Sequence, residues 1–181
     1  TLEVSGPIAL DPGSLAGEPA VCSLPGDGIA VIYDDGTGNL QVNYLDQDGA
    51  YVGGPVPLSA TEEGHQDRPS CARIAGGKMA VAYSSCANEG PCEVHAQVLK
   101  AGGAKYGQTV TASAAGEGVQ AYDVKVVSTN EGAYALSWHQ ATGDADGWSS
   151  MIRFYGSDIA PKGSPVRVNV LEVGNQVRPV L

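Results

Sequence analysis

The sequence predicts an all-β fold, and its composition supplies the first two observations. Of the 181 residues, 25 are Gly and 11 are Pro, far more turn-forming residues than a helical bundle uses. Apolar residues make up 43% of the chain and charged residues 17%, so the chain can bury a core and does not have the composition of a disordered segment. The third observation is an internal repeat, found at residues 19–33, 69–83 and 124–138.

Each copy of the repeat predicts four short strands. An apolar strand, a glycine turn and an alternating strand come first, and the alternating strand ends in Tyr33, Tyr83 or Trp138, spaced 50 and then 55 residues apart. A third strand follows, and a fourth begins near Gly53–Leu58, Gly107–Ala112 and Gly163–Val168. Four antiparallel strands per unit of this length are typical of a β-propeller blade. A β-sandwich of about twelve strands is the alternative.

The repeat divides the chain into one propeller domain that we expect to be incomplete. Its parts are an outer strand of a preceding blade (1–18), blade 1 (19–66), blade 2 (67–120), blade 3 (121–176) and the start of a further blade (177–181). Propellers close with about four to eight blades, so three are too few. We therefore expect the remaining blades to come from a longer parent chain or from a second copy of this chain.

A second recurrent motif marks the predicted joins between blades. It reads Gly64-His-Gln66, Gly118-Val-Gln120 and Gly174-Asn-Gln176, with intervals of 54 and 56 residues. A Gln side chain can donate and accept at once, which suits a segment crossing from one blade to the next. The sequence leaves two roles open for Gln66, Gln120 and Gln176: tying the backbone of the crossover, or lining a ligand pocket.

The segments Gly64-His-Gln-Asp-Arg-Pro69 and Asp46-Gln-Asp-Gly49, together with the strands between such motifs, resemble repeats of large secreted bacterial proteins. The resemblance covers nearly the whole chain. It implies a secreted, extracellular propeller module used for display, adhesion or binding. Integrin-type blades are similar in size, but their calcium loop, Asp-x-Asp-x-Asp-Gly, is not found in this sequence.

The four cysteines predict two pairings. Cys86 and Cys92 bracket a short, turn-rich loop that a disulfide would close. Cys22 and Cys71 fall in the first strands of neighbouring blades, where they form either a disulfide between blades or two buried thiols. Disulfides favour an oxidising compartment outside the cytosol.

Charge and hydropathy narrow the range of partners. Asp and Glu number 20 against 10 Lys and Arg, a net charge of −10 that would repel a phosphate backbone. We therefore expect no nucleic-acid partner. No stretch approaches the roughly 18 apolar residues of a membrane span, so we expect none.

Candidate ligand-binding residues come from the third blade and from the joins. Trp148 lies in an inserted loop with Asp144 and Asp146, and it either caps a ligand or folds back over the outer strand. Arg68 and Arg178 recur as Arg-Pro, with Tyr122 or Asp123 at that place in the third copy, and each could instead bond an acidic neighbour. The three Gln residues of the joins complete the set.

Metal binding and catalysis have weaker support. The acidic turns at 34–39, 46–49 and 144–147 offer about two carboxylates each, whereas calcium takes six to eight oxygens, and hairpin turns account for the same residues. Calcium stays open, and we expect no other cofactor. His65, His95 and His139 lack metal-ligand spacing, and no Gly-x-Ser-x-Gly motif occurs.

These observations predict a non-enzymatic extracellular binding or adhesion module that recognises a protein or a glycan. A carbohydrate-binding propeller lectin is the alternative, and a fragment of a propeller hydrolase is a third reading. The sequence names no individual ligand.

Overall fold

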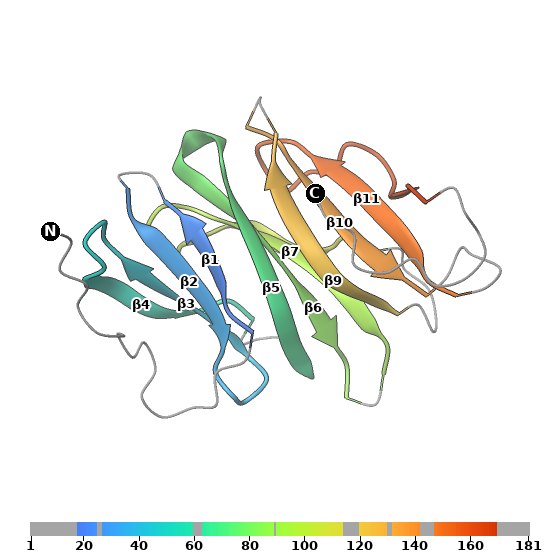
Figure 1. The fold of residues 1–181 in the computed structure, drawn as a ribbon, viewed down its shortest axis with the longest axis horizontal. Coiled ribbons are helices and arrows are strands. Elements are labelled where there is room, and N and C mark those ends of the chain that lie inside the picture. Colours follow the sequence, from blue (N-terminus) through green and yellow to red (C-terminus); the bar gives the residue numbers. More distant parts are fainter. Residues whose placement is uncertain are drawn as a thin grey trace, which may run out of the picture.

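The computed structural model describes residues 18–24, 27–59, 63–88, 90–113, 120–129, 132–141 and 147–169. In this part of the chain three antiparallel sheets of four strands each lie side by side (Figure 1). The strands of the first sheet are β1 (Ala20–Ser23), β2 (Ile29–Asp34), β3 (Leu40–Leu45) and β4 (Tyr51–Pro57). Those of the second are β5 (His65–Ile74), β6 (Lys78–Cys86), β7 (Cys92–Leu99) and β8 (Lys105–Thr111). Those of the third are β9 (Ala121–Ser128), β10 (Tyr134–Gln140), β11 (Ser149–Tyr155) and β12 (Val166–Arg167).

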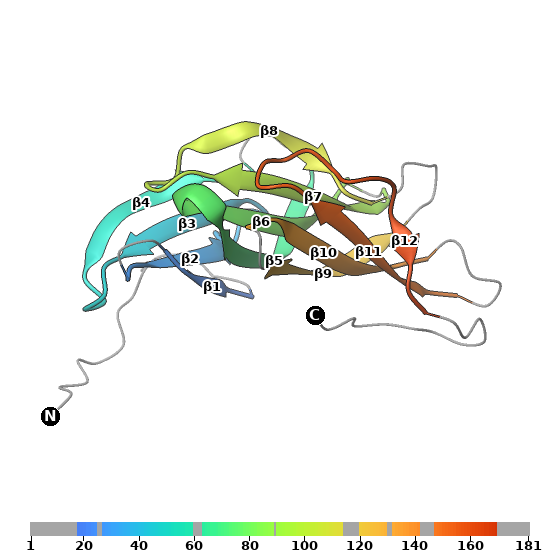
Figure 2. The ribbon, with the colours of Figure 1, turned by 90° about the horizontal axis from the view of Figure 1, so that it is seen from above.

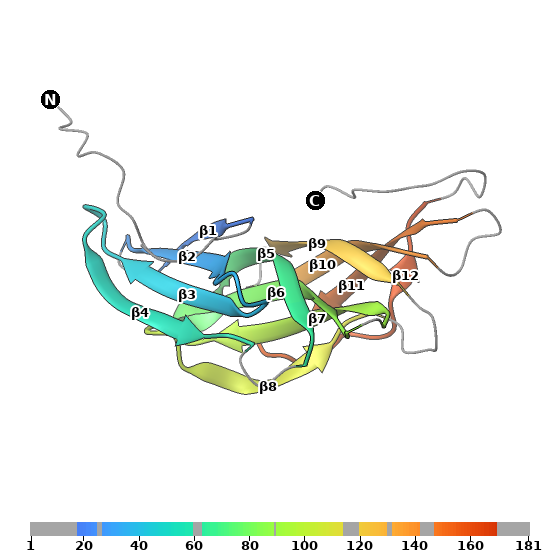
Figure 3. The ribbon, with the colours of Figure 1, turned by 90° about the horizontal axis from the view of Figure 1, so that it is seen from below.

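Within every sheet the strands are neighbours in chain order, as in a propeller blade. The first strands β1, β5 and β9 lie beside one another on one side of the molecule, whereas β4 and β8 lie on the other side (Figures 2 and 3). The sheets are therefore arranged around their first strands, which a two-sheet sandwich does not do. The predicted all-β, propeller-like class is confirmed.

The second sheet is covered on both faces because β6 alternates between two cores. Met79, Val81 and Tyr83 pack toward the first sheet, and Ala80 and Ala82 pack toward the third. On the facing side the third sheet contributes large side chains: Tyr134, Leu136 and Trp138. Burying one such side chain contributes about 1.5–3 kcal/mol, so this alternation accounts for much of the cohesion between sheets.

Two disulfides are present. Cys22 of β1 is joined to Cys71 of β5, with Cα atoms 6.0 Å apart, so this disulfide links the first strands of neighbouring sheets. Cys86 and Cys92 are directly opposite each other in the β6–β7 hairpin, with Cα atoms 3.9 Å apart. Both pairings named from the sequence occur in the structure, and at Cys22 and Cys71 it shows the disulfide between blades.

The side chains of Gln66 and Gln120 both form hydrogen bonds with backbone groups. Gln66 is fully buried; its backbone N–H donates to the carbonyl of Gly38 (2.8 Å), and its side-chain amide donates to that of Glu63 (3.1 Å). The side-chain oxygen of Gln120 accepts from the N–H of Cys92 at 3.3 Å. Gln66 therefore ties the backbone of a crossover, Gln120 instead bonds the backbone of the β6–β7 hairpin, and Gln176 lies outside the described residues.

The strands expected within 1–18 and 177–181 also lie outside the described residues, except for Glu18. Within the described ranges, no helix has both the length and the apolar character needed to cross a membrane. A single 3₁₀ turn, η1 (Ala75–Gly77), connects β5 to β6 there.

Candidate functional site

The candidate site lies where β5 and β9 begin. Since neighbouring strands are antiparallel, the end of β10 and the start of β11 lie at the same end of the third sheet, and the hairpin closed by Cys86–Cys92 lies at that end of the second. The described residues that flank the two insertions in the repeat, Ala87 and Pro91 in the second sheet and Ala141 and Gly147 in the third, therefore lie at this end. Loops held by a rigid scaffold are common places for binding residues.

Arg68 and Asp123 occupy equivalent positions of the repeat in neighbouring sheets. Both are non-glycine residues with positive φ, 50° and 53°, and both lie at a shift of strand register, opposite Tyr83 and Trp138. A β-bulge redirects the side chain it carries, and strained backbone of this kind is often found at ligand sites. Here the two side chains meet: Nη1 of Arg68 donates to Oδ1 of Asp123 at 2.7 Å.

Glu18 holds the equivalent position in the first sheet and lies on the other side of the guanidinium. Its Oε2 is 3.9 Å from Nε of Arg68. Burial acts to lower the pKa of Arg68, but the carboxylates of Asp123, Asp67 and Glu18 outweigh it and raise that pKa above its ordinary value. Arg68 is therefore a permanent cation between carboxylates contributed by two other sheets.

Three aromatic rings cluster beside this charged pair: Tyr122 lies near Arg68, His139 lies near Asp123, and Trp148 contacts both rings. Tyr122 is 5.5 Å from Trp148 and 5.8 Å from His139 between ring centroids, and Trp148 meets His139 edge to face at 4.9 Å. The guanidinium carbon of Arg68 is 5.8 Å from the centre of the Tyr122 ring. Tyr122 and Trp148 are both partly exposed, so the cluster combines accessible ring surface with a planar polar pair.

His139 and Asp123 connect the rings to the ion pair. The His139 side chain is 8% exposed, and its Nδ1 lies 3.6 Å from Oδ2 of Asp123. The Asp123 carboxylate thus accepts a hydrogen bond from Arg68 and also lies close to the ring of His139. The hydroxyl of Tyr122 donates to the side-chain oxygen of Gln120, which fixes the position of its ring. We name Arg68, Tyr122, Asp123, His139 and Trp148 the Arg68–Trp148 site.

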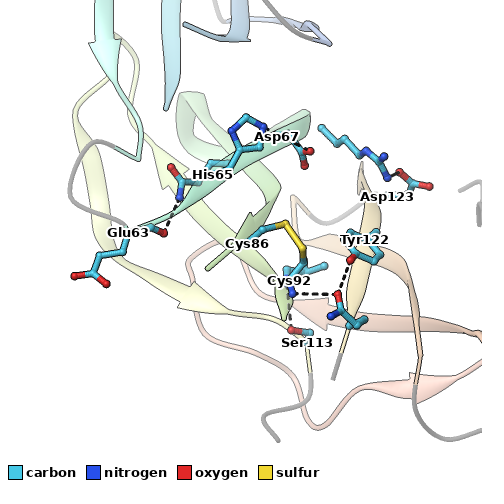
Figure 4. Close-up of a disulfide and its surroundings, with 12 residues drawn as sticks. Glu63, His65, Asp67, Cys86, Cys92, Ser113, Tyr122 and Asp123 are labelled. Atoms are coloured by element: carbon cyan, nitrogen blue, oxygen red, sulfur yellow. Dashed lines mark hydrogen bonds and ion pairs between the residues drawn. A yellow bond between two sulfur atoms is a disulfide. The ribbon is translucent and has the colours of Figure 1, made fainter. Parts of the chain in front are cut away.

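A histidine between two carboxylates lies next to this site. Nε2 of His65 is 3.7 Å from Oδ2 of Asp34 and 3.9 Å from Oδ2 of Asp67. Burial raises the pKa of Asp67, and attraction to Arg68 and His65 offsets only part of that rise. Figure 4 shows His65, Asp67 and Asp123 following one another along this end of the sheets, with Tyr122 close to the Cys86–Cys92 disulfide.

A pocket of about 400 Å³ opens beside the β6–β7 hairpin. It is lined by Glu63, Ser85, Ala87, Pro91, Glu93 and His95. Nε2 of His95 lies 3.4 Å from Oε2 of Glu93. Carboxylates therefore line this part of the molecule as well.

Three residues predicted from the sequence are brought together: Arg68, Trp148 and Gln120 all contact Tyr122. Gln66 is buried in the crossover and is not part of the site. Asp144, Asp146, Gln176 and Arg178 lie outside the described residues. Tyr122, Asp123 and His139 were not predicted as ligand residues from the sequence. The signal that could have found them is Asp123, which has the repeat position of Arg68 and the opposite charge.

The acidic turns use their carboxylates locally. Oδ1 of Asp34 accepts from the N–H of Gly36 at 2.8 Å, and Oδ1 of Asp46 accepts from the N–H groups of Asp48 and Ala50 at 2.9 and 2.8 Å. These are the bonds by which Asp stabilises a turn. Among the described residues, no three His, Cys, Asp or Glu side chains are grouped to hold a metal ion.

No protein-family model matches the sequence, and a search of curated proteins finds no match. Solved structures do match. A thermostable family-43 glycoside hydrolase aligns with a TM-score of 0.59 and 13% identity, over 88% of this chain and 55% of its own. An α-L-arabinofuranosidase from Clostridium thermocellum aligns with a TM-score of 0.53 and 14% identity, over 85% of this chain and 52% of its own.

A fucose lectin from Kordia zhangzhouensis, solved with methyl-fucoside, aligns with a TM-score of 0.46 and 6% identity, over 83% of this chain and 97% of its own. At that TM-score the likeness does not define a shared fold.

The chain spans about half the length of the two hydrolase structures. Identities this low show architecture alone, and the chain shares with these hydrolases a propeller fold.

Proposed function

We propose that this propeller module binds a carbohydrate at the Arg68–Trp148 site. The observation that carries the proposal is the grouping of two partly exposed aromatic rings with a planar ion pair, in which Tyr122 lies near both Trp148 and Arg68. A sugar presents an apolar C–H face that packs on an aromatic ring, and hydroxyls that exchange hydrogen bonds with guanidinium and carboxylate groups. The fold supports the same ligand class, because the two hydrolases that share it act on glycosides.

We propose an extracellular location and a binding role for the module. The two disulfides support an oxidising compartment. Binding is favoured over catalysis because the Asp123 carboxylate is paired with the guanidinium of Arg68 at 2.7 Å, which makes it a weaker nucleophile or base. The site supports a role in adhesion in which the module attaches to a glycan.

Glycan binding can be tested on an array of oligosaccharides with the full chain, with affinities then measured by calorimetry. The Trp148→Ala variant should lose binding by tenfold or more, on the order of 1.4 kcal/mol. Tyr106→Ala is the matched control, because Tyr106 is a 38% exposed aromatic residue at the opposite end of the second sheet. Folded wild-type protein that binds nothing on a broad array would refute the proposal.

Glycoside hydrolysis is the second candidate, and Asp67 is the observation that favours it. Its carboxyl is half-buried with a raised pKa, and Oδ1 has no hydrogen-bond partner among the described residues. A carboxyl of this kind can act as a general acid. Release of nitrophenol from nitrophenyl arabinosides or xylosides, abolished in Asp67→Asn, would establish hydrolysis; turnover that survives this substitution would dismiss Asp67 as the acid.

We also propose that the outer faces of the first and third sheets pack against further propeller blades of a longer chain. Val21 on the first sheet is 64% exposed, and Phe154 and Val166 on the third are 47% and 55% exposed. Phe154 pairs with Ala135, on the face opposite the one that packs against the second sheet. Light scattering tests the proposal against its alternative, a second copy: a concentration-dependent dimer would favour that copy, and a stable monomer would refute both.

A further inference from the structure

We propose that the Arg68–Trp148 site selects neutral sugars over sugars that carry a carboxylate, and that Asp123 is the residue that sets this preference. The inference rests on the proposed carbohydrate-binding function and adds a ligand class to it. It is based on the pairing of Arg68 with carboxylates of the protein. Among the described residues, Arg68 is the one Arg or Lys in the site.

Arginine is the usual receptor for a carboxylate, because its planar guanidinium can hold both oxygens at once. In this structure the carboxylates beside the guanidinium of Arg68 come from the protein itself. Asp123 holds Nη1 at 2.7 Å, and Glu18 lies 3.9 Å from Nε. The Arg68 side chain is 40% exposed, so a ligand can reach it, but an acidic sugar would have to displace Asp123 or share the cation with it.

The charges around the site add to this barrier. In and beside the second sheet, Glu63, Asp67 and Glu93 lie at the end that carries the site. Apart from Arg68, the Arg and Lys residues described in this sheet and its turns lie at the other end, in or next to the β5–β6 and β7–β8 turns: Arg73, Lys78, Lys100 and Lys105. A uronate or sialate would therefore approach a surface of its own sign. Like charges a few ångströms apart repel each other, and the repulsion is stronger where the charges are partly buried.

Asp123 is the position where this preference can be changed with least disturbance. Asparagine has the same shape, keeps a carbonyl oxygen to accept from Nη1 of Arg68, and removes one negative charge. It also tolerates a positive φ, which this position requires at 53°. Asp123→Asn should therefore leave the backbone and rings in place while freeing the charge of Arg68 for a ligand.

The experiment compares matched pairs of monosaccharide-terminated probes, galactose with galacturonic acid and glucose with glucuronic acid, for the wild type and Asp123→Asn. Wild type should prefer each neutral probe by about tenfold or more, and the variant should reduce that ratio by about tenfold, as removal of one close charge would do. High salt should also narrow the ratio. Asp48→Asn, in the exposed turn at the other end of the first sheet, has the same change in net charge and should keep the wild-type ratio.

The possible outcomes distinguish a failure of the proposed selectivity from a failure of the proposed carbohydrate binding. Wild-type protein that binds uronates as tightly as neutral probes overturns the selectivity, while carbohydrate binding stands. An unchanged ratio in Asp123→Asn, or loss of both probe classes from a variant with wild-type circular dichroism, overturns the assignment to Asp123. Wild-type protein that binds no glycan overturns the proposed function, and the selectivity with it.

Discussion

Arg68 and Asp123 are separated by 55 residues, hold the same position in successive copies of the repeat, and form an ion pair of 2.7 Å. Each has a positive φ, so two neighbouring strands are bent alike and direct opposite charges toward each other. Because both side chains are partly exposed, at 40% and 24%, the pair itself contributes about 1 kcal/mol or less to stability. Its significance is that it connects two blades at the proposed ligand site.

Because of the backbone strain at Arg68, we expect glycine to be better tolerated than alanine at this position, the reverse of the usual order in a strand. Arg68→Ala and Arg68→Gly both remove the side chain, but only glycine adopts φ 50° without cost. We expect the glycine variant to be more stable than the alanine variant by about 1 kcal/mol in urea denaturation. At Lys125, an exposed residue of β9 outside the positive-φ positions, alanine should be the better of the two. The same order at both positions would contradict the strain.

The two disulfides should differ in their contribution to stability. Cys22 and Cys71 are 49 residues apart and Cys86 and Cys92 only 6, and a longer closed loop restricts the unfolded chain more. Replacing the first pair by alanine should lower the free energy of unfolding by about 4 kcal/mol, and replacing the second by about 2 kcal/mol. Thiol titration of the denatured, unreduced protein is the preliminary check: two free thiols would disprove the longer bridge.

Gly64 of the first complete Gly-x-Gln motif should resist substitution. Its φ is +88°, and a Cβ there would collide with the carbonyl oxygen of Cys86. Gly64→Ala should therefore lower the free energy of unfolding by at least about 2 kcal/mol. Gly53 in β4 is the control, since nothing lies within 4 Å of a Cβ at that position, and Gly53→Ala should change stability by no more than about 1 kcal/mol. Equal effects would remove the proposed reason for glycine at 64.

Asp67 should make the protein less stable as pH rises. Burial raises the pKa of its carboxyl in the folded state, so the folded protein holds this proton more tightly than the unfolded chain does. Stability is lost as pH climbs from the ordinary Asp pKa through the raised one. Asp67→Asn should be more stable than wild type above this window and equal to it below.

Asp35 is the control, because its carboxyl pKa is shifted in the opposite direction to that of Asp67. Partial burial acts to raise the pKa of its carboxyl, but hydrogen bonds from Thr37, Gln41 and Asn39 outweigh this and lower it. Its contribution is present above the ordinary pKa and is lost as pH falls through the lowered value. Urea titrations across acid pH that give Asp67→Asn and Asp35→Ala the same pH dependence would contradict these assignments.

The sequence was sufficient for the repeating architecture because that information is local. Strand alternation, glycine turns and the recurring aromatic position define a blade within about 50 residues, and Tyr83 and Trp138 are fully buried where the repeat places them. Cys86 and Cys92 were likewise predictable, since a six-residue loop keeps them close in any hairpin.

Only the tertiary structure decided the site. Arg68 and Asp123 belong to different sheets, and they meet because β5 and β9 lie side by side and bulge at equivalent points. Trp148, just before β11, joins them through Tyr122 of β9. A β-bulge or a positive φ angle at Arg or Asp cannot be recognised in a sequence. The free-energy cost of such a backbone conformation is offset by tertiary packing, which local sequence does not reveal. The choice at Cys22 and Cys71 stayed open for the same reason: the distance between two strands from different blades depends on how the blades pack.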